Sequence, residues 1–287
     1  MGRIRVAQNY DESALEIERP QPLSDNRIES LTMNLLSGLG KLDSDITDQV
    51  YVDFKKEMPQ WISQSKLNKL HGLESFFRID ICNGCTQFID NIYINQHPQI
   101  LKGDYKYHER LNQYIQYIEV GNLVPLIPLI VAMPFPAIGK PHKHMTELLD
   151  ECLDKHIPVH IDGAWITCSR DLNFDLSHPA IQSFAVSLSK GLGLGWNRIA
   201  LRWSKAVTAD SISIMNDFHM NNRALVKIGL HFIRNLPSDY LWEIHGNNYY
   251  KVCKDFNLTP TNSIHLALRD GNPVGVSPLL RYLENNV

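Results

Sequence analysis

Three short apolar-rich runs, each followed by turn-forming residues, constrain the fold of this chain most. They cover residues 77–82, 129–133 and 157–162. Runs of this length are typical of strands that are buried on both faces of a sheet. A helical pattern over residues 143–156 separates the second run from the third. Strand, helix and strand in this order predict a right-handed crossover within a parallel sheet.

The rest of the chain also alternates between helical and strand patterns. A helical pattern covers residues 26–73, and helical patterns return after Ser211. Shorter strands are expected at residues 183–188 and 199–203, and a mixed stretch follows at 263–268. The sequence therefore predicts an α/β fold, a mainly parallel sheet flanked by helices with a reduced C-terminal small subdomain. The expected parts are an N-terminal arm (1–25), a large domain (26–205) and a small subdomain (206–287).

Charge and composition favour a small-molecule substrate. The 28 basic and 31 acidic residues nearly cancel and are spread along the chain, so neither nucleic acid nor a membrane is the expected partner. The most apolar stretch, residues 123–138, contains four prolines and is shorter than the roughly 20 residues of a spanning helix. Five cysteines and a polar start without a signal-like segment favour a reducing cytoplasm.

The side chains with the clearest chemical potential lie between residues 159 and 203. Asp162 ends a predicted strand and Lys190 follows the next one, so both are expected at the carboxyl edge of the sheet. Pyridoxal phosphate needs an amine for its aldehyde, an acid for its ring nitrogen and donors for its phosphate. Lys190 offers the amine and Asp162 the acid, while Ser187, Ser189 and Arg198 offer the donors.

Two motifs in this region resemble those of a known family. Asp-Gly-Ala-Trp at 162–165 and Ser-Leu-Ser-Lys at 187–190, followed by Arg198, are similar to class I/II aminotransferases of the fold-type I pyridoxal-phosphate superfamily. The resemblance implies that Lys190 holds the cofactor as a Schiff base and that Asp162 faces its ring nitrogen. It also implies a homodimer in which each chain completes the site of the other. Tyr10 and Tyr51 are candidates for the residue that crosses the interface.

The resemblance extends upstream of these motifs. The turn at residues 81–90 resembles the strand-to-helix turn that holds the cofactor phosphate in the family, which implies a phosphate role for Gly84, Cys85 and Thr86. A helix N-terminus presents unpaired amides to an anion, which supports this role independently. Tyr105 corresponds to the aromatic residue that stacks on the cofactor ring.

Several positions depart from the family pattern. Pro136 occupies the place of an asparagine that bonds the cofactor hydroxyl, and the indole N–H of Trp165 is expected to compensate. His265 stands where the family has a carboxylate-binding arginine, and Arg269 lies close to it in sequence, so both are candidate substrate-binding residues. The chain is also shorter than is usual for the family.

The leading functional hypothesis is an aminotransferase that uses an amino acid and a keto acid, with Lys190 as cofactor anchor and general base. A second hypothesis is another reaction of the same cofactor, such as decarboxylation, elimination or oxidation. A third is a binding protein that retains the fold without chemistry. The sequence alone leaves all three open.

Other chemistry-bearing residues favour structural interpretations. Cys82 and Cys85 have the spacing of a metal or redox pair, but nothing completes a zinc site, so no metal is expected. His160 is expected to lie on the same strand face as Asp162 and to support it. Trp196, like most tryptophans, is expected in the core.

Overall fold

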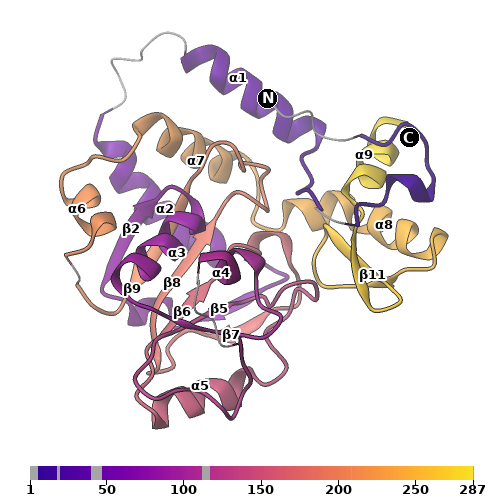
Figure 1. Ribbon diagram of the computed structural model, residues 1–287. Coiled ribbons are helices and arrows are strands. Elements are labelled where there is room, and N and C mark those ends of the chain that lie inside the picture. The colour runs from indigo at the N-terminus through magenta and orange to yellow at the C-terminus, as the bar shows by residue number, and fades with distance from the viewer. Residues whose placement is uncertain (1–5, 18–19, 40–46, 112–116, 208, 287) are drawn as a thin grey trace.

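A twisted sheet runs through the centre of the computed structural model, which describes residues 6–17, 20–39, 47–111, 117–207 and 209–286. Its strand order is β2-β9-β8-β6-β5-β3-β4. The strands are β2 (Arg78–Cys82), β9 (Ala200–Ser204), β8 (Ile181–Ser187), β6 (Val159–Asp162), β5 (Leu129–Ala132), β3 (Gln99–Leu101) and β4 (Tyr117–Ile118). The strand β9 runs opposite to all the others in this sheet, so its pairs with β2 and β8 are antiparallel. The pairs from β8 to β4 are parallel. The predicted α/β fold with a mainly parallel sheet is confirmed (Figure 1).

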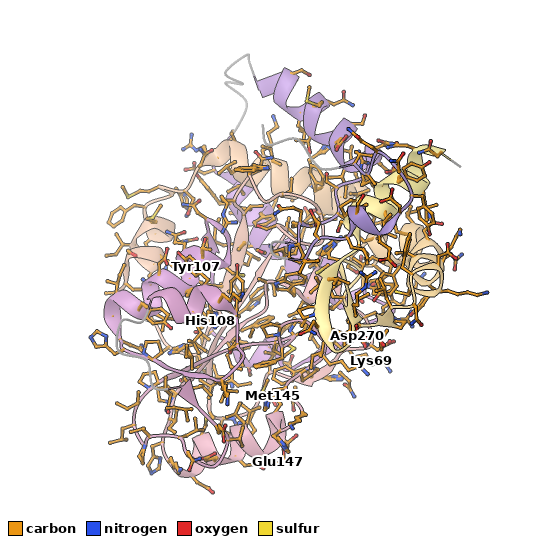
Figure 2. All side chains as sticks on the ribbon, turned by 45° about the vertical axis from the view of Figure 1, so that its right-hand side comes forward. Lys69, Tyr107, His108, Met145, Glu147 and Asp270 are labelled. Atoms are coloured by element: carbon orange, nitrogen blue, oxygen red, sulfur yellow. The ribbon has the colours of Figure 1, made fainter. Side chains whose placement is uncertain are left out.

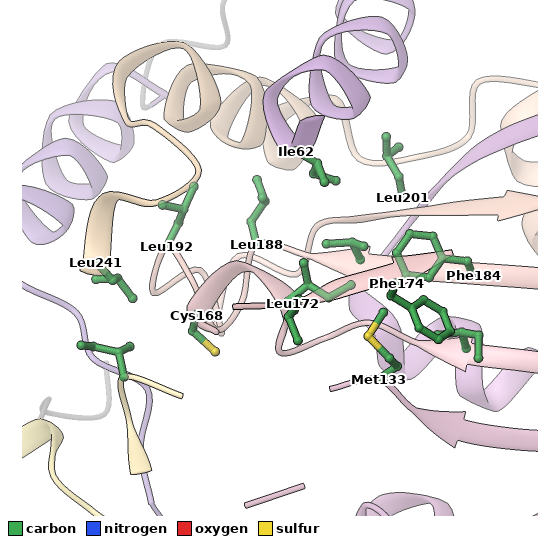
Figure 3. Close-up of a cluster of buried hydrophobic side chains, with 14 of the residues drawn as sticks. Ile62, Met133, Cys168, Leu172, Phe174, Phe184, Leu188, Leu192, Leu201 and Leu241 are labelled. Carbon is green, nitrogen blue, oxygen red and sulfur yellow. The ribbon is translucent and has the colours of Figure 1, made fainter. Parts of the chain in front are cut away.

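The strands are buried on both faces because their side chains alternate between two apolar clusters. On β8, Ala185 packs with one cluster while Phe184 and Val186 pack with the other. On β5, Ile130 faces the first cluster and its neighbours in the strand face the second. Figure 3 shows Phe184 and Met133 within the second cluster. Two buried faces explain why the strands read as continuous apolar runs.

Helices cover the two faces of the sheet. The predicted crossover helix is α5 (Met145–Asp154), between the parallel neighbours β5 and β6. The helix α3 (Gly84–Asn95) packs against β8 and β9. Figure 2 labels Met145 and Glu147 on α5, and Tyr107 and His108 on the short helix α4 (Lys106–Leu111).

The predicted helical pattern over residues 26–73 is only partly right. It contains α1 (Asn26–Leu39) and α2 (Gln49–Ser63), followed by the strand β1 (Lys69–His71) and the 3-10 turn Leu73–Ser75. The strand β1 pairs with β7 (Asn173–Asp175), about a hundred residues away in sequence. Local periodicity carries no signal for such a distant pairing, which is why the strand was missed.

Helices that follow residue 206 divide between two parts of the molecule. The helices α6 (Ser211–Asp217) and α7 (Arg223–Asn235) pack against β2 and α2, beside the sheet. A C-terminal unit contains α8, the antiparallel strands β10-β11-β12 and α9. Its bounds are α8 (Tyr240–Asp255), β10 (Thr259–Pro260), β11 (Leu266–Arg269), β12 (Asn272–Gly275) and α9 (Ser277–Asn286). The domain boundary near residue 205 stays a prediction.

The N-terminal part of the chain packs on the C-terminal unit. After the 3-10 turn Glu12–Ala14, Glu16 exchanges two backbone hydrogen bonds with Gly275, of 3.0 and 2.7 Å. Tyr10 stacks on Tyr282 of α9, with ring centroids 5.8 Å apart. None of the helices in the described ranges is both long enough and apolar enough to span a bilayer.

Candidate active site

A cavity of about 520 Å³ lies at the edge of the sheet where β6 and β8 end and β9 begins. Because β9 runs against its neighbours, the residues before it reach the same edge as the residues after β6 and β8. The cavity is therefore built from segments far apart in sequence. Its lining includes Gln21, Pro22, Ser24, Cys85, Thr86, Ile89, Tyr105, Asp162, Ala164, Ser187, Ser189, Lys190, Gly193, Gly195, Trp196 and Arg198.

Most of the candidate cofactor residues lie around this one cavity. The candidates in its lining are Cys85, Thr86, Tyr105, Asp162, Ser187, Ser189, Lys190 and Arg198. Gly84 lies directly behind them, where a Cβ atom would stand 2.5 Å from Nη2 of Arg198. Trp165 lies next to Lys190, whose Nζ is 5.2 Å from the indole centroid. His265 and Arg269 are not among the described residues that line the cavity.

One end of the cavity is suited to an anion. Gly84 begins α3 in a left-handed conformation (φ 76°), which lets the chain turn sharply from β2 into the helix. Arg198 donates from Nη2 to the hydroxyl of Thr86 in the first turn of that helix. A guanidinium beside the amides of a helix N-terminus favours a phosphate group.

Asp162 also lines the cavity and is held firmly. Its side chain is buried, and Oδ1 accepts a 3.0 Å hydrogen bond from the amide of Ala164. Its Oδ2 lies 3.3 Å from Nε2 of His108, and Nδ1 of the same ring lies 3.5 Å from Oδ1 of Asp104. The imidazole therefore bridges two buried carboxylates.

The two carboxylates favour the protonated form of His108. Burial by itself lowers the pKa of His108, but the hydrogen bonds with Asp104 and Asp162 raise it to about 9. Asp104 is fixed in turn by the amides of Tyr105 (2.6 Å) and Ala132 (3.2 Å). The sequence analysis missed His108. The only local signal is its place four residues after Asp104.

Lys190 lies in the turn after β8 and lines the cavity. Burial lowers the pKa of Lys190, and the nearby Arg198 acts in the same direction. The amine lies over the face of Trp165. Among the described side chains, no carboxylate lies within ion-pair distance of it. A buried lysine with a lowered pKa is suited to nucleophilic attack on a carbonyl carbon.

The two candidate substrate-binding residues are engaged elsewhere. The His265 side chain is fully buried and bonded through both ring nitrogens to backbone groups of Leu23 and Lys190. Arg269 reaches outward to Glu12, with 3.4 Å between Nη1 and Oε2. Neither guanidinium nor imidazole faces the cavity, so their role in binding substrate gains no support from the structure.

Two further expectations differ from what the structure contains, and a third, the interface tyrosines, is not tested by a single chain. Trp196 lines the mouth of the cavity and is 78% exposed, so the expected core position is wrong. His160 bonds to Ser183 (2.7 Å) and Gln96 (3.2 Å) rather than to Asp162. The hydroxyls of the two candidate interface tyrosines bond within their own chain, Tyr10 to Asp255 and Tyr51 to Asn221.

The described cysteines and acidic side chains form no metal centre. No group of three or more His, Cys, Asp or Glu side chains within the described ranges could hold a metal ion. Cys82 and Cys85 are both buried and unpaired, and burial raises the pKa of each thiol. Both therefore stay protonated at neutral pH.

Comparison with solved structures identifies the fold. No family model matches the sequence, and no curated protein matches it either. A histidinol-phosphate aminotransferase from Clostridium acetobutylicum superposes with a TM-score of 0.60 at 12% identity, covering 95% of this chain and 99% of the other. A pyridoxal-phosphate-bound C-S lyase from Staphylococcus hominis has a TM-score of 0.57 at 10% identity, covering 88% and 76%.

A third similar structure is that of an enzyme named for a different reaction. The L-threonine-O-3-phosphate decarboxylase from Porphyromonas gingivalis has a TM-score of 0.59 at 11% identity, covering 88% of this chain and 80% of the other. The chain thus has the aminotransferase-like fold of the fold-type I pyridoxal-phosphate enzymes, as the resemblance in sequence indicated. Since one fold supports a transferase, a lyase and a decarboxylase, the fold does not select the reaction.

Proposed function

We propose that this chain is a pyridoxal-phosphate-dependent enzyme of the aminotransferase type that acts on an amino acid. The observation that carries the proposal is the lining of one cavity by an amine, a carboxylate and a guanidinium, those of Lys190, Asp162 and Arg198. These groups match the aldehyde, the ring nitrogen and the phosphate of the cofactor.

Two features of the cavity support the fit of the cofactor. The hydroxyl of Ser189 is buried without a hydrogen-bond partner, although the residue lines the cavity. A buried donor of this kind is stabilised by an acceptor on a ligand. Gly84 leaves the space that Arg198 needs beside the N-terminus of α3. Both features belong to the residues proposed to hold the phosphate.

The proposed binding roles follow from these positions. The phosphate is held by Arg198 and the first turn of α3, with Thr86, Ser187 and Ser189 as hydroxyl donors. Asp162 would accept a hydrogen bond from the protonated ring nitrogen, and Nε2 of His108 lies 3.3 Å from Oδ2 of the same carboxylate. Tyr105 would stack on the ring, and the Trp165 indole N–H would donate to the ring hydroxyl in place of Pro136, which has no side-chain donor.

Lys190 performs the proton transfer in this proposal. When bound, the cofactor supplies an electron sink that stabilises negative charge at the substrate α-carbon. With the substrate bound, the Lys190 amine would act as the general base that removes and returns a proton at the substrate α-carbon. The lowered pKa of Lys190 favours the neutral amine that this step requires.

A different reaction of the same cofactor is the second candidate. It is favoured by the positions of His265 and Arg269, neither of which offers a cation to a substrate carboxylate in the described cavity. Decarboxylation, elimination and oxidation all begin with the same cofactor residues. We also propose a cytoplasmic location, which agrees with the absence of disulfides among the described cysteines. The sequence resemblance further supports a homodimer.

Visible absorption tests the cofactor assignment. Purified protein mixed with pyridoxal phosphate should turn yellow, and borohydride should fix the cofactor covalently to Lys190, which peptide mass analysis can locate. Lys190→Ala should abolish both effects. Lys205→Ala is the matched control, because burial lowers the pKa of this lysine too but its amine bonds to Ser177 and His178 outside the cavity. A Lys190→Ala protein that binds the cofactor as wild type does would refute the assignment.

Product analysis then separates the reactions. The loaded protein is incubated with a panel of amino acids, without a keto acid. A keto acid together with the aminated cofactor indicates transamination, whereas carbon dioxide or ammonia without it indicates the second candidate. Unchanged absorption and no product with any amino acid would instead favour a binding protein that has lost its chemistry.

A further inference from the structure

One wall of the cavity comes from a segment that the C-terminal unit holds in place. Residues 20–25, called the strap below, contribute Gln21, Pro22 and Ser24 to the lining. The carbonyl of Gln21 accepts a 2.8 Å hydrogen bond from Ser277 at the start of α9. The strap therefore covers the cavity as a part of the C-terminal unit.

The end of the strap is anchored just as firmly. Asp25 is buried and accepts hydrogen bonds from Tyr240 (2.7 Å) and His245 (2.9 Å), both on α8. It also accepts the amide of Ile28 in the first turn of α1 (2.8 Å). The pKa of Asp25 is lowered, because these hydrogen bonds outweigh the effect of burial. The strap is thus fixed at both ends.

His265 joins the middle of the strap to the proposed catalytic lysine. Its Nδ1 accepts the amide hydrogen of Leu23 at 3.1 Å, and its Nε2 lies 2.9 Å from the carbonyl oxygen of Lys190. A carbonyl only accepts, so Nε2 carries the hydrogen and Nδ1 does not. Both contacts together require a neutral imidazole in a single tautomer.

The surroundings of His265 maintain that state. The side chain is fully buried, and burial lowers its pKa to about 3. Its ring meets Trp165 edge to face, with centroids 5.8 Å apart, and Trp165 in turn lies under the amine of Lys190. His265 therefore touches the backbone of Lys190 directly and its side chain through one aromatic ring.

The backbone next to Lys190 has little room to move independently. Gly191 packs so closely on Thr167 that a side chain at this position would clash with it. With Gly191 fixed on one side, the hydrogen bond from His265 determines the direction of the Lys190 peptide group. A shift of the strap would pull on the imidazole and therefore on the lysine.

We propose that His265 is a positioning residue that couples the strap to Lys190, so that the lysine backbone is held in place while the strap covers the cavity. The importance of Lys190 rests on the proposed function. The mechanical coupling does not, and it can be measured in cofactor-free protein.

Two conservative variants separate the two hydrogen bonds. In His265→Asn the amide oxygen stands as many bonds from Cβ as Nδ1 does, so it can accept from Leu23 but cannot reach Lys190. In His265→Gln the amide nitrogen stands as many bonds from Cβ as Nε2 does, so it can donate to Lys190. Tyr10→Phe is the control, since it removes another hydrogen bond between the N-terminal part and α8, to Asp255, away from the cavity.

Amide hydrogen exchange of cofactor-free full-length protein is the readout, followed for the strap and for residues 188–192. Coupling predicts that each His265 variant accelerates exchange about fivefold to tenfold in both segments, the effect of one lost hydrogen bond. Without coupling, His265→Asn accelerates only residues 188–192 and His265→Gln accelerates only the strap. That outcome, or the same acceleration in Tyr10→Phe, would overturn the proposal.

Cofactor titration adds a readout that a purely structural histidine would not change. We expect His265→Asn to raise the dissociation constant of pyridoxal phosphate about fivefold to tenfold and to shift the pH midpoint of the visible band, whereas His265→Gln partly restores both. Unchanged titrations in His265→Asn would contradict the positioning role. If wild-type protein binds no cofactor, the proposed function fails, and the exchange comparison still decides the coupling.

Discussion

Two clusters of buried charge sit on the same sheet and differ in how completely they are paired. The first, the β2–β9 ion cluster, consists of Arg78, Asp80, Arg202 and Asp210. Asp80 and Arg202 are direct partners across the two strands, with 2.6 Å between Oδ2 and Nη2. Arg78 lies 2.8 Å from Asp80, and Arg202 lies 2.5 Å from Asp210. Each charge in this cluster has an opposite charge within the chain, and Nε of Arg202 is its one described atom that is buried without a hydrogen-bond partner.

The second, the cavity cluster, consists of Asp162, His108, Ser189, Lys190 and Arg198. Here Lys190 lies over an aromatic ring and the Ser189 hydroxyl is buried without a partner. Burying polar groups without full pairing lowers stability, and such groups are concentrated where a ligand completes them. The comparison suggests that the first cluster serves stability and the second serves binding and chemistry.

Replacing one aspartate in each cluster by asparagine gives the strongest test of whether the two clusters have different roles. We expect Asp162→Asn to lower turnover by about 10²- to 10⁴-fold, because the ring nitrogen of the cofactor loses its charged partner. The free energy of unfolding should fall less than in Asp80→Asn, because His108, unlike Arg202, can release its proton, and because the amide can still accept from Ala164. Steady-state kinetics and urea unfolding of the same preparation measure both. A variant that unfolds easily but retains turnover would reverse the assignment.

Asp80→Asn should give the opposite pattern. Removing this charge leaves Arg202 buried with only Asp210 beside it, which should lower the free energy of unfolding by about 3–5 kcal/mol. Turnover per folded molecule should be unchanged, because Asp80 is not part of the cavity lining. If turnover falls as far as in Asp162→Asn, the ion cluster belongs to the active site.

The contrast also separates what the sequence predicts from what it does not. Asp162, Ser187 and Lys190 sit at the ends of strands that periodicity identifies, and parallel strands place their carboxyl ends at one edge. Their meeting at one cavity could therefore be predicted from local pattern alone. The fold class follows from the same alternation of buried strands and helices.

His108 and the strap could not be predicted in this way. His108 reaches Asp162 only because α4 packs under the sheet edge, and the two residues are 54 positions apart. Ser24 and Gln21 line the cavity because the N-terminal part pairs with β12, a contact between opposite ends of the chain. For His265 the resemblance indicated a position near the site, but its role depends on Leu23 and Lys190, which only the folded chain brings to it.

A pH titration of stability sharpens the account of the cavity cluster. The pKa of His108 is raised from its ordinary 6.5 to about 9, so the stabilisation by its charge is fully present below pH 6.5 and is lost as pH rises through 9. Between these values, His108 should add a slope of up to about −1.4 kcal/mol per pH unit to the free energy of unfolding. His108→Gln should remove that slope. Denaturant unfolding at pH 6, 7, 8 and 9 checks it, and equal slopes would show that His108 is neutral.

The smallest expected effect compares Ser213, which contacts the β2–β9 ion cluster, with Ser189 of the cavity cluster. The Ser213 hydroxyl lies 2.9 Å from Nη2 of Arg202, so Ser213→Ala should lower the free energy of unfolding by about 1 kcal/mol. Ser189→Ala should leave the stability of cofactor-free protein unchanged or slightly higher, because it removes a buried hydroxyl that has no partner. The same change should weaken pyridoxal-phosphate binding about fivefold to tenfold, whereas Ser213→Ala should not. If both substitutions lower the free energy of unfolding equally and neither weakens cofactor binding, the proposed difference in role between the two clusters is wrong.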